Sequence, residues 1–246
     1  MNLTNEIAKY LDFVLKNYPE CTLSMLINKD DEKFNDYFSV IKNSIQILYL
    51  LELYEEHEKI SSTSQFFICK IRKSYTRFIY LYPLNEYYSI ESILRQVSEN
   101  VLRFCLTIQS KDKCINDVQN MKYRNLWENN LKKGTLYSYK SNIMNYFNTQ
   151  FRISSDYLHD KKEIDPMKFF ECTLKQELPY SNDRATKFNT YLRNFILEVI
   201  VSETKINENE DYTIAQKHII KETKKRIRKK EVFQCMKNLK VSGEQY

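Results

Sequence analysis

The residues whose types and spacing best suit chemistry lie in one stretch, residues 146–159, which reads YFNTQFRISSDYLH. If this stretch is helical, Arg152 and His159 are two turns apart, about 10 Å along the axis and about 20° around it. Ser155 lies between them on the same stripe. Arginine offers a rigid fork that matches a phosphate group, and histidine exchanges protons near neutral pH. The row therefore predicts a site in which a phosphodiester lies along one face of a helix.

The neighbouring stripe of this helix is apolar. It carries Phe147, Phe151 and Leu158, the kind of face that a helix buries. An ordinary amphipathic helix with two polar residues at its edge shows the same Arg/His spacing, and this alternative stays open. The longer pattern Arg-x-x-Ser-x-x-Leu-His, preceded by an aromatic residue, is more specific than the spacing alone.

Composition indicates an all-α protein. The 246 residues are 42% hydrophobic and 14% aromatic, which is ample for a core and argues against disorder. The chain has only 2 Gly and 4 Pro, and this scarcity favours long helices over hairpin-rich folds, although Asn can replace Gly in turns. Apolar residues at spacings of three and four predict helices over residues 2–17, 34–59, 89–108, 114–131, 135–158, 167–178, 184–202 and 212–239.

Residues 66–82 are ambiguous. Their density of Phe, Ile, Tyr and Thr suits a strand. As a helix, however, the segment would place Lys70, Lys73 and Arg77 on one face, and no other segment offers a strand partner. We therefore interpret it as a helix. Its basic face is either simply solvated or contacts nucleic acid.

Most of the positive charge lies near the end of the chain. Residues 215–240 contain ten Lys or Arg and two Glu, a net +8, and the whole chain carries +6, so the remaining residues sum to −2. The predicted helix 212–239 is therefore a candidate for gathering an RNA backbone, with a partner-binding or solubilising segment as the alternative. The RNA-binding candidates are Lys224, Lys225, Arg226, Arg228, Lys229 and Lys230.

Nothing in the sequence calls for a metal, a cofactor or a membrane. The six Cys form no C-x-x-C pair and show no zinc-like spacing with His. His57 stands among glutamates, but their spacing matches no ligand motif, and an acidic helix end is usually just solvated. No signal peptide opens the chain, and the longest apolar run is too short to cross a bilayer. We therefore expect a cytoplasmic protein that uses no metal and no cofactor.

A resemblance emerges when the motif is combined with the helix before it. The predicted helix 89–108 carries charges of alternating sign at steps of four, at Glu91, Arg95, Glu99 and Arg103. A connecting region and the Arg152–His159 motif follow. This order of parts resembles the HEPN superfamily, whose members are α-helical bundles and whose ribonuclease branch carries an Arg-x(4–6)-His motif.

The resemblance covers about residues 89–202 and implies three regions. Residues 1–85 would be an N-terminal helical extension, residues 86–205 a HEPN-like helical bundle, and residues 206–246 a basic C-terminal helix and tail. It says nothing about what the first region does.

The resemblance also implies a chemistry: metal-independent cleavage of RNA, in which the ribose 2′-OH attacks its own 3′-phosphate. His159 would transfer a proton, and Arg152 would hold the phosphate and offset developing charge. Ser155 would orient one of the two or pack the helix pair. Glu99 or Arg95 would hold the imidazole or extend the anion site.

The implied partners follow from the chemistry. One Arg/His pair supplies a single proton-transfer group, whereas the reaction uses an acid and a base, so we expect a homodimer or a complex with another HEPN protein. Members of the family often act as toxins or abortive-infection effectors in bacterial antiviral defence. An antitoxin or another defence-system protein is therefore a candidate partner, beside RNA.

Two departures from the family pattern keep other functions open. Ile153 follows the motif Arg where catalytic members often have Asn, Asp or His, and Asp160 follows the motif His where a small residue is common. Both favour a non-catalytic HEPN-like subunit that binds a partner protein or nucleic acid. A further alternative is a nucleic-acid-binding helical protein of a mobile element, unrelated to HEPN and driven by its basic tail.

Overall fold

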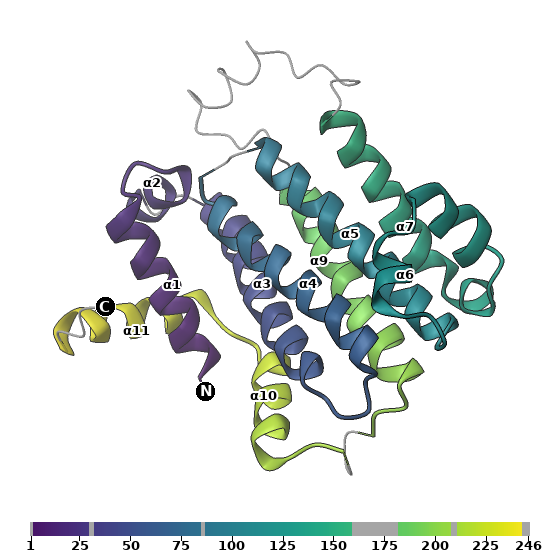
Figure 1. Cartoon of the computed structure of the whole chain (residues 1–246). Helices are drawn as coiled ribbons and strands as arrows, with labels where there is room; N and C mark the ends of the chain where they lie inside the picture. The colour runs from purple at the N-terminus through teal and green to yellow at the C-terminus, as the bar shows by residue number, and fades with distance from the viewer. Residues whose placement is uncertain (1, 30–31, 85–86, 159–181, 208–210, 243–246) are drawn as a thin grey trace.

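The computed structural model describes residues 2–29, 32–84, 87–158, 182–207 and 211–242 (Figure 1). Every regular element in these ranges is a helix, which confirms the all-α prediction. In chain order the elements are α1 (Leu3–Asn17), α2 (Thr22–Asn28), α3 (Phe34–Glu55), α4 (Ser62–Leu81), α5 (Tyr87–Gln109), α6 (Ile115–Gln119), the π-helix η1 (Asn125–Leu131), α7 (Thr135–Leu158), α9 (Asn182–Asn194), the π-helix η2 (Phe195–Val201), α10 (Ile214–Lys224) and α11 (Lys229–Ser242). The helix predicted over residues 167–178 lies outside the described residues.

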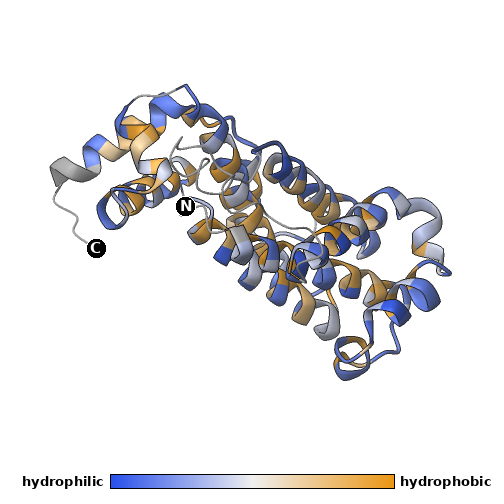
Figure 2. Cartoon of the chain, turned by 90° about the horizontal axis from the view of Figure 1, so that it is seen from above, coloured by the Kyte–Doolittle hydropathy of each residue, from blue (hydrophilic) through white to orange (hydrophobic). Residues whose placement is uncertain are grey.

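Helix α5 is packed on several sides. Helix α4 covers one side of it and α7 another, and η1 and α6 contact it as well (Figure 1). The predicted stripe is buried, for example at Ile90, Leu94 and Val101, and so are Leu102 and Leu106, which lie outside that stripe. In Figure 2 the hydrophobic residues concentrate on the sides of the helices that face one another. A helix with a wide apolar face is expected to be packed against several neighbours, while its polar residues stay at the edges of that face.

The ambiguous segment is helical, as we interpreted it. Ser61 begins α4 as its N-cap, because its hydroxyl accepts a hydrogen bond from the Ser64 backbone N–H. Ile71, Tyr75 and Phe78 follow at spacings of four and three and are all buried. Their burial on one face of a helix explains why the aromatic density of this segment does not indicate a strand.

The structure corrects two predicted helices. Residues 114–131 form α6 and η1 with a break between them. The predicted basic helix 212–239 also divides, into α10 and α11, with Lys225 in an extended conformation between them. Within this run, cations stand four apart at Lys224/Arg228 and at Arg226/Lys230, and like charges at that spacing disfavour a continuous helix. The break also lets Ile227 become buried.

Two further features lie near the start of the chain. The N-cap of α1 is Asn2, whose side chain accepts from two backbone N–H groups. Residues 22–28, which lie between the predicted helices 2–17 and 34–59, form α2. This segment is only seven residues long, which is too short for a helical periodicity to stand out, although Leu23 and Leu26 anchor it in the core.

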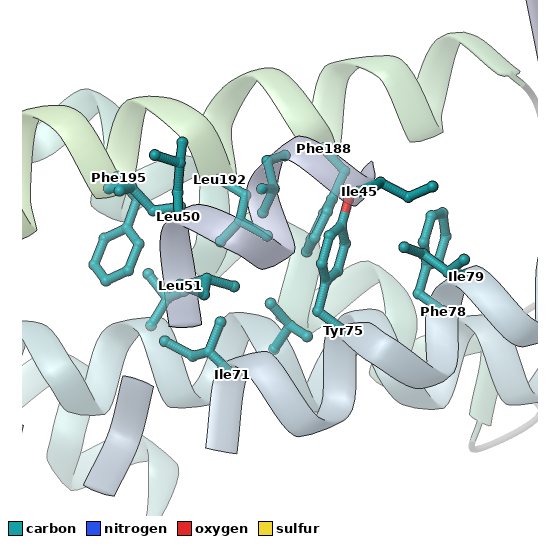
Figure 3. Packing of buried hydrophobic residues seen from close by; sticks show 14 of the residues in the cluster. Ile45, Leu50, Leu51, Ile71, Tyr75, Phe78, Ile79, Phe188, Leu192 and Phe195 are labelled. Atoms are coloured by element: carbon teal, nitrogen blue, oxygen red, sulfur yellow. The ribbon is translucent and has the colours of Figure 1, made fainter. Parts of the chain in front are cut away.

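A buried hydrogen-bond network joins α9 to α3 and α4. Asn189 donates to the Val40 carbonyl at 3.2 Å and to the Ser44 hydroxyl at 3.0 Å, and it accepts from the Tyr75 hydroxyl. The Ser44 and Tyr75 hydroxyls also pair at 2.9 Å. These side chains are surrounded by apolar residues from the same three helices, as Figure 3 shows around Tyr75. The network therefore satisfies polar groups that would otherwise be buried without partners.

Substituting Asn189 with Ala should destabilise the protein. The change leaves the Tyr75 hydroxyl and the Val40 carbonyl with an unfilled bonding position in the core, so we expect a loss of about 2 kcal/mol or more in the free energy of unfolding. Thr190→Ala, on the exposed side of the same helix, should change it by less than about 0.5 kcal/mol. Urea denaturation of both variants measures the difference. Equal midpoints for the two would contradict the role of the network.

Candidate functional site

Arg152 lies on the exposed side of α7. The helix kinks at Lys140 and then runs regularly through the motif to Leu158. Phe147 and Phe151 are buried on its inner face, as predicted. The Arg152 side chain is exposed and makes no hydrogen bond or ion pair with any residue that the structure describes. Its guanidinium is therefore available to an anion.

An aromatic contact ties this part of α7 to its neighbours. The ring of Tyr123, which precedes η1, stacks on the ring of Phe151 with centroids 3.6 Å apart. The Arg95 guanidinium of α5 lies over the same ring at 5.0 Å, and its Nε is buried without a hydrogen-bond partner among the described residues. Phe151, the residue that precedes Arg152, thus holds the Arg95 side chain of α5 against α7.

The pKa of the Tyr123 hydroxyl depends on its burial and on two nearby charges. Burial raises the pKa of Tyr123, the Glu99 carboxylate raises it further, and Arg152 lowers it. Glu99 and Arg152, which belong to α5 and α7, therefore act on one group. The structure in this way brings Arg95, Glu99 and Arg152 into one region around the Tyr123–Phe151 stack, although no direct bond joins the three.

Two of the predicted site residues already have partners within the protein. The Ser155 hydroxyl donates to the Phe151 carbonyl of its own helix at 2.7 Å. Glu99 binds Arg103 at 2.6 Å, and the other bonds of Arg103 go to the backbone carbonyls of Val118 and Met121. This clamp holds the α6 region against α5. The predicted His159 lies outside the described residues, since α7 ends at Leu158.

Sequence reasoning missed a buried ion pair near the end of α7. Glu91 is wholly buried and binds Arg184 of α9 through both carboxylate oxygens, one at 2.8 Å. The Arg184 guanidinium also lies 5.7 Å from the ring centre of Tyr157 on α7. Only Glu99–Arg103 among the expected i,i+4 pairs of α5 forms a salt bridge. No local signal links Glu91 to a residue 93 positions later.

The basic residues near the end of the chain occupy a turn and two helix ends. Lys224 ends α10, and Lys229 begins α11 with its ammonium group 4.8 Å from the ring centre of Phe34. Lys225, Arg226, Arg228 and Lys230 are exposed. A cavity of about 720 Å³ borders α10, and its lining residues are Tyr212, Lys217, Ile220, Lys221, Glu222, Lys224 and Lys225.

His57 does not point to a metal site. It is buried against the rings of Tyr54 and Tyr212, and its Nδ1 accepts the backbone N–H of Lys59 at 3.2 Å. Burial lowers the pKa of this imidazole. Across the described ranges there is no cluster of three or more His, Cys, Asp or Glu side chains placed to hold a metal. None of the helices in those ranges combines the length and apolar character needed to span a membrane.

The Glu91–Arg184 pair yields an asymmetric prediction. Arg184→Gln leaves a wholly buried carboxylate unpaired, whereas Glu91→Gln leaves a guanidinium that still reaches water. We expect the first change to lower the free energy of unfolding by about 3 kcal/mol or more and the second by less. The double variant should lose less than the sum of the two. Lys132→Gln, which breaks an exposed pair, serves as the control and should change stability by under about 1 kcal/mol in urea denaturation. Additive effects of the two changes would contradict direct pairing.

Comparison of the chain with protein-family models, curated proteins and solved structures found no match. The resemblance to the HEPN superfamily stays a prediction, and it rests on the Arg152–His159 motif and on the helix that precedes it. The structure adds that the motif is on a helix through Leu158 and that the two helices pack against each other. Function must be argued from these residues and their surroundings.

Proposed function

We propose that this protein is a metal-independent endoribonuclease of the HEPN type. In the reaction, the ribose 2′-oxygen attacks the adjacent phosphorus and loses its proton to a base, while the P–O5′ bond breaks and the 5′-oxygen receives a proton. The products are a 2′,3′-cyclic phosphate and a 5′-OH end. A toxin or abortive-infection effector of bacterial antiviral defence is the biological role that this activity suggests.

The observation that carries the proposal is the exposure of the Arg152 side chain. It is an exposed arginine with no partner among the described residues, in a motif that places a histidine seven positions later. Arginine presents donors that match phosphate oxygens and keeps its charge throughout the reaction. Arg152 would hold the phosphate and stabilise the charge that develops on it, and His159 would transfer the proton.

The surroundings of Arg152 suggest what its neighbours contribute. Arg95 lies against Phe151 and adds positive charge beside the phosphate position. Glu99 is held by Arg103 and influences the Tyr123 hydroxyl, so its role is to shape the local field. Ser155 is bonded to its own helix and acts in helix packing. A second copy of the chain, or another HEPN protein, would supply the second proton-transfer group.

A non-catalytic nucleic-acid-binding subunit is the second candidate. Its support is Ile153 in the motif together with two basic surfaces, one on α4 and one between α10 and α11. This candidate predicts binding that weakens steeply with salt and needs neither Arg152 nor His159.

Cleavage of RNA in the presence of EDTA tests the proposal. We expect the purified protein to cut labelled RNA without a metal and to leave cyclic-phosphate ends. His159→Ala and Arg152→Ala should each lower the rate at least about 100-fold, the range seen when a proton-transfer group or a charge-stabilising donor is removed. Gel analysis of the product ends before and after treatment with a cyclic phosphodiesterase measures the outcome.

Ser155→Ala is the matched control, because among the described residues its hydroxyl bonds to the backbone of its own helix, α7. It should retain cleavage within a few-fold of the wild-type rate. Activity that survives in His159→Ala would overturn the assignment of the histidine. Absence of any cleavage by folded protein, with RNA binding intact, would favour the non-catalytic subunit.

A further inference from the structure

The α4–α5 hairpin encloses a polar cleft that the proposed reaction does not use. The cleft has a volume of about 400 Å³. Helix α4 contributes Lys70, Lys73, Ser74 and Arg77, α5 contributes Gln96, Glu99, Asn100 and Arg103, and α6 contributes Gln119. None of its described lining residues has a large apolar side chain, so it does not suit a hydrophobic ligand.

The cleft carries an excess of positive charge. Arg103 and Glu99 neutralise each other as an ion pair. Lys70, Lys73 and Arg77 remain, and none of them makes an ion pair with a residue that the structure describes.

The other side of α4 shows the contrasting arrangement. There Arg72 forms an ion pair with Glu55 of α3. This pairing lowers the pKa of the Glu55 carboxyl, and Lys73 lowers the same pKa less. The cations of the cleft are thus left for an anion from outside.

The geometry of α4 matches an extended anion rather than a single one. Lys70, Lys73 and Arg77 stand at steps of three and four, so they share one face and span about 10 Å along the helix axis. The Lys70 ammonium rests 4.7 Å from the ring centre of Phe66. A row of this length can meet more than one phosphate of a nucleic-acid strand at once.

The opposite wall offers neutral hydrogen-bonding groups. Gln96 accepts from the Ser74 hydroxyl at 3.4 Å, which joins the two helices at the floor of the cleft. Asn100 donates one amide hydrogen to the Gln96 backbone carbonyl at 2.8 Å. Its side-chain oxygen accepts no hydrogen bond from the part of the chain that the structure describes and can accept from a ribose hydroxyl. Cations on one wall and amides on the other suit a sugar-phosphate backbone.

The cleft leads toward the candidate catalytic site. Glu99 lines the cleft and follows Arg95 by one helical turn on α5, and the Arg95 guanidinium lies 5.0 Å from the ring centre of Phe151, the residue before Arg152. A strand that lies along α4 and crosses α5 would therefore arrive at Arg152. The cavity beside α10 is a weaker candidate, because those of its lining residues that the structure describes come from one segment of the chain, residues 212–225, rather than from two packed helices.

We propose that the α4–α5 cleft binds the backbone of single-stranded RNA through Lys70, Lys73 and Arg77 and directs the strand toward Arg152. The choice of RNA rests on the proposed function, whereas the binding of a polyanionic strand rests on the cleft itself. The site lies outside the motif that carries the proposed chemistry.

Binding of a labelled single-stranded RNA of about 20 nucleotides to the full chain tests this inference. The His159→Ala background keeps the RNA intact during fluorescence anisotropy. At about 100 mM salt, Lys73→Ala with Arg77→Ala should weaken binding by about tenfold or more, and the slope of log K against log salt should fall by about 1.4. Both side chains are exposed, so the variant should fold normally by circular dichroism.

A charge-matched pair serves as the control. Lys111→Ala with Lys133→Ala removes two exposed charges, one after α5 and one before α7, and should change affinity by less than about threefold. Arg226→Ala with Arg228→Ala removes two charges from the basic turn, which is the competing RNA-binding surface. The inference is overturned if the cleft variant binds like the control, or if the loss appears only in the Arg226/Arg228 variant. Equal affinity for single-stranded DNA of the same sequence would overturn the choice of RNA.

The two proposals can fail separately. RNA that binds in the cleft but is never cut by the wild-type chain would refute the ribonuclease and leave the cleft assignment standing. RNA that is cut equally well by the wild-type chain and by the Lys73/Arg77 variant at low RNA concentration would refute the cleft. If both proposals hold, the variant should cut slowly at low RNA concentration and regain its rate at saturation.

Discussion

The hydrogen bonds of Asn189 are the interaction on which the arrangement of this protein depends. Helix α9 comes late in the chain, yet it lies in the core against α3 and α4, and each polar group that it brings there must find a partner. Asn189 fills this need with Val40, Ser44 and Tyr75. An amide with four bonding positions fits only one register, so the network specifies how α9 is placed along the two earlier helices.

The placement of α9 bears directly on the candidate site. Its first turns carry Arg184, which binds the buried Glu91 of α5 and lies beside Tyr157 near the end of α7. The motif helix is therefore held at its C-terminal end by α9 and near Phe151 by Arg95 and Tyr123. Arg152 is thus an exposed group on a well-fixed helix, which is the condition under which a phosphate-binding side chain can be positioned for chemistry. Helix α5 packs against α7 on one side and against α4 on another, so it connects the motif helix with the α4–α5 cleft.

Periodicity predicted the elements well where an apolar stripe was long. The helix over residues 135–158 and the buried face of α5 follow from local spacing alone. What spacing could not reveal is which polar residues pair across the chain. Spacing places Glu91 in a series of alternating charges at steps of four, but Glu91 binds an arginine 93 positions away. The basic run near the end looked continuous because like-charge repulsion and the burial of Ile227 do not show in an apolar pattern. Arg152 and Phe151 were found from sequence, whereas the contacts of Arg95 and Tyr123 with Phe151 depend on tertiary packing.

The central claim is that the RNA itself supplies the nucleophile, with Arg152 holding the phosphate. The most direct test uses an RNA oligonucleotide in which one ribose, at a position that the protein cuts, is replaced by 2′-deoxyribose. The account predicts that the linkage on the 3′ side of that sugar stays intact, while the same linkage in the all-ribose RNA is cut in EDTA. Cleavage of the deoxy-substituted linkage at the normal rate would contradict attack by the 2′-OH, and absence of cleavage at every linkage in both RNAs would contradict the ribonuclease.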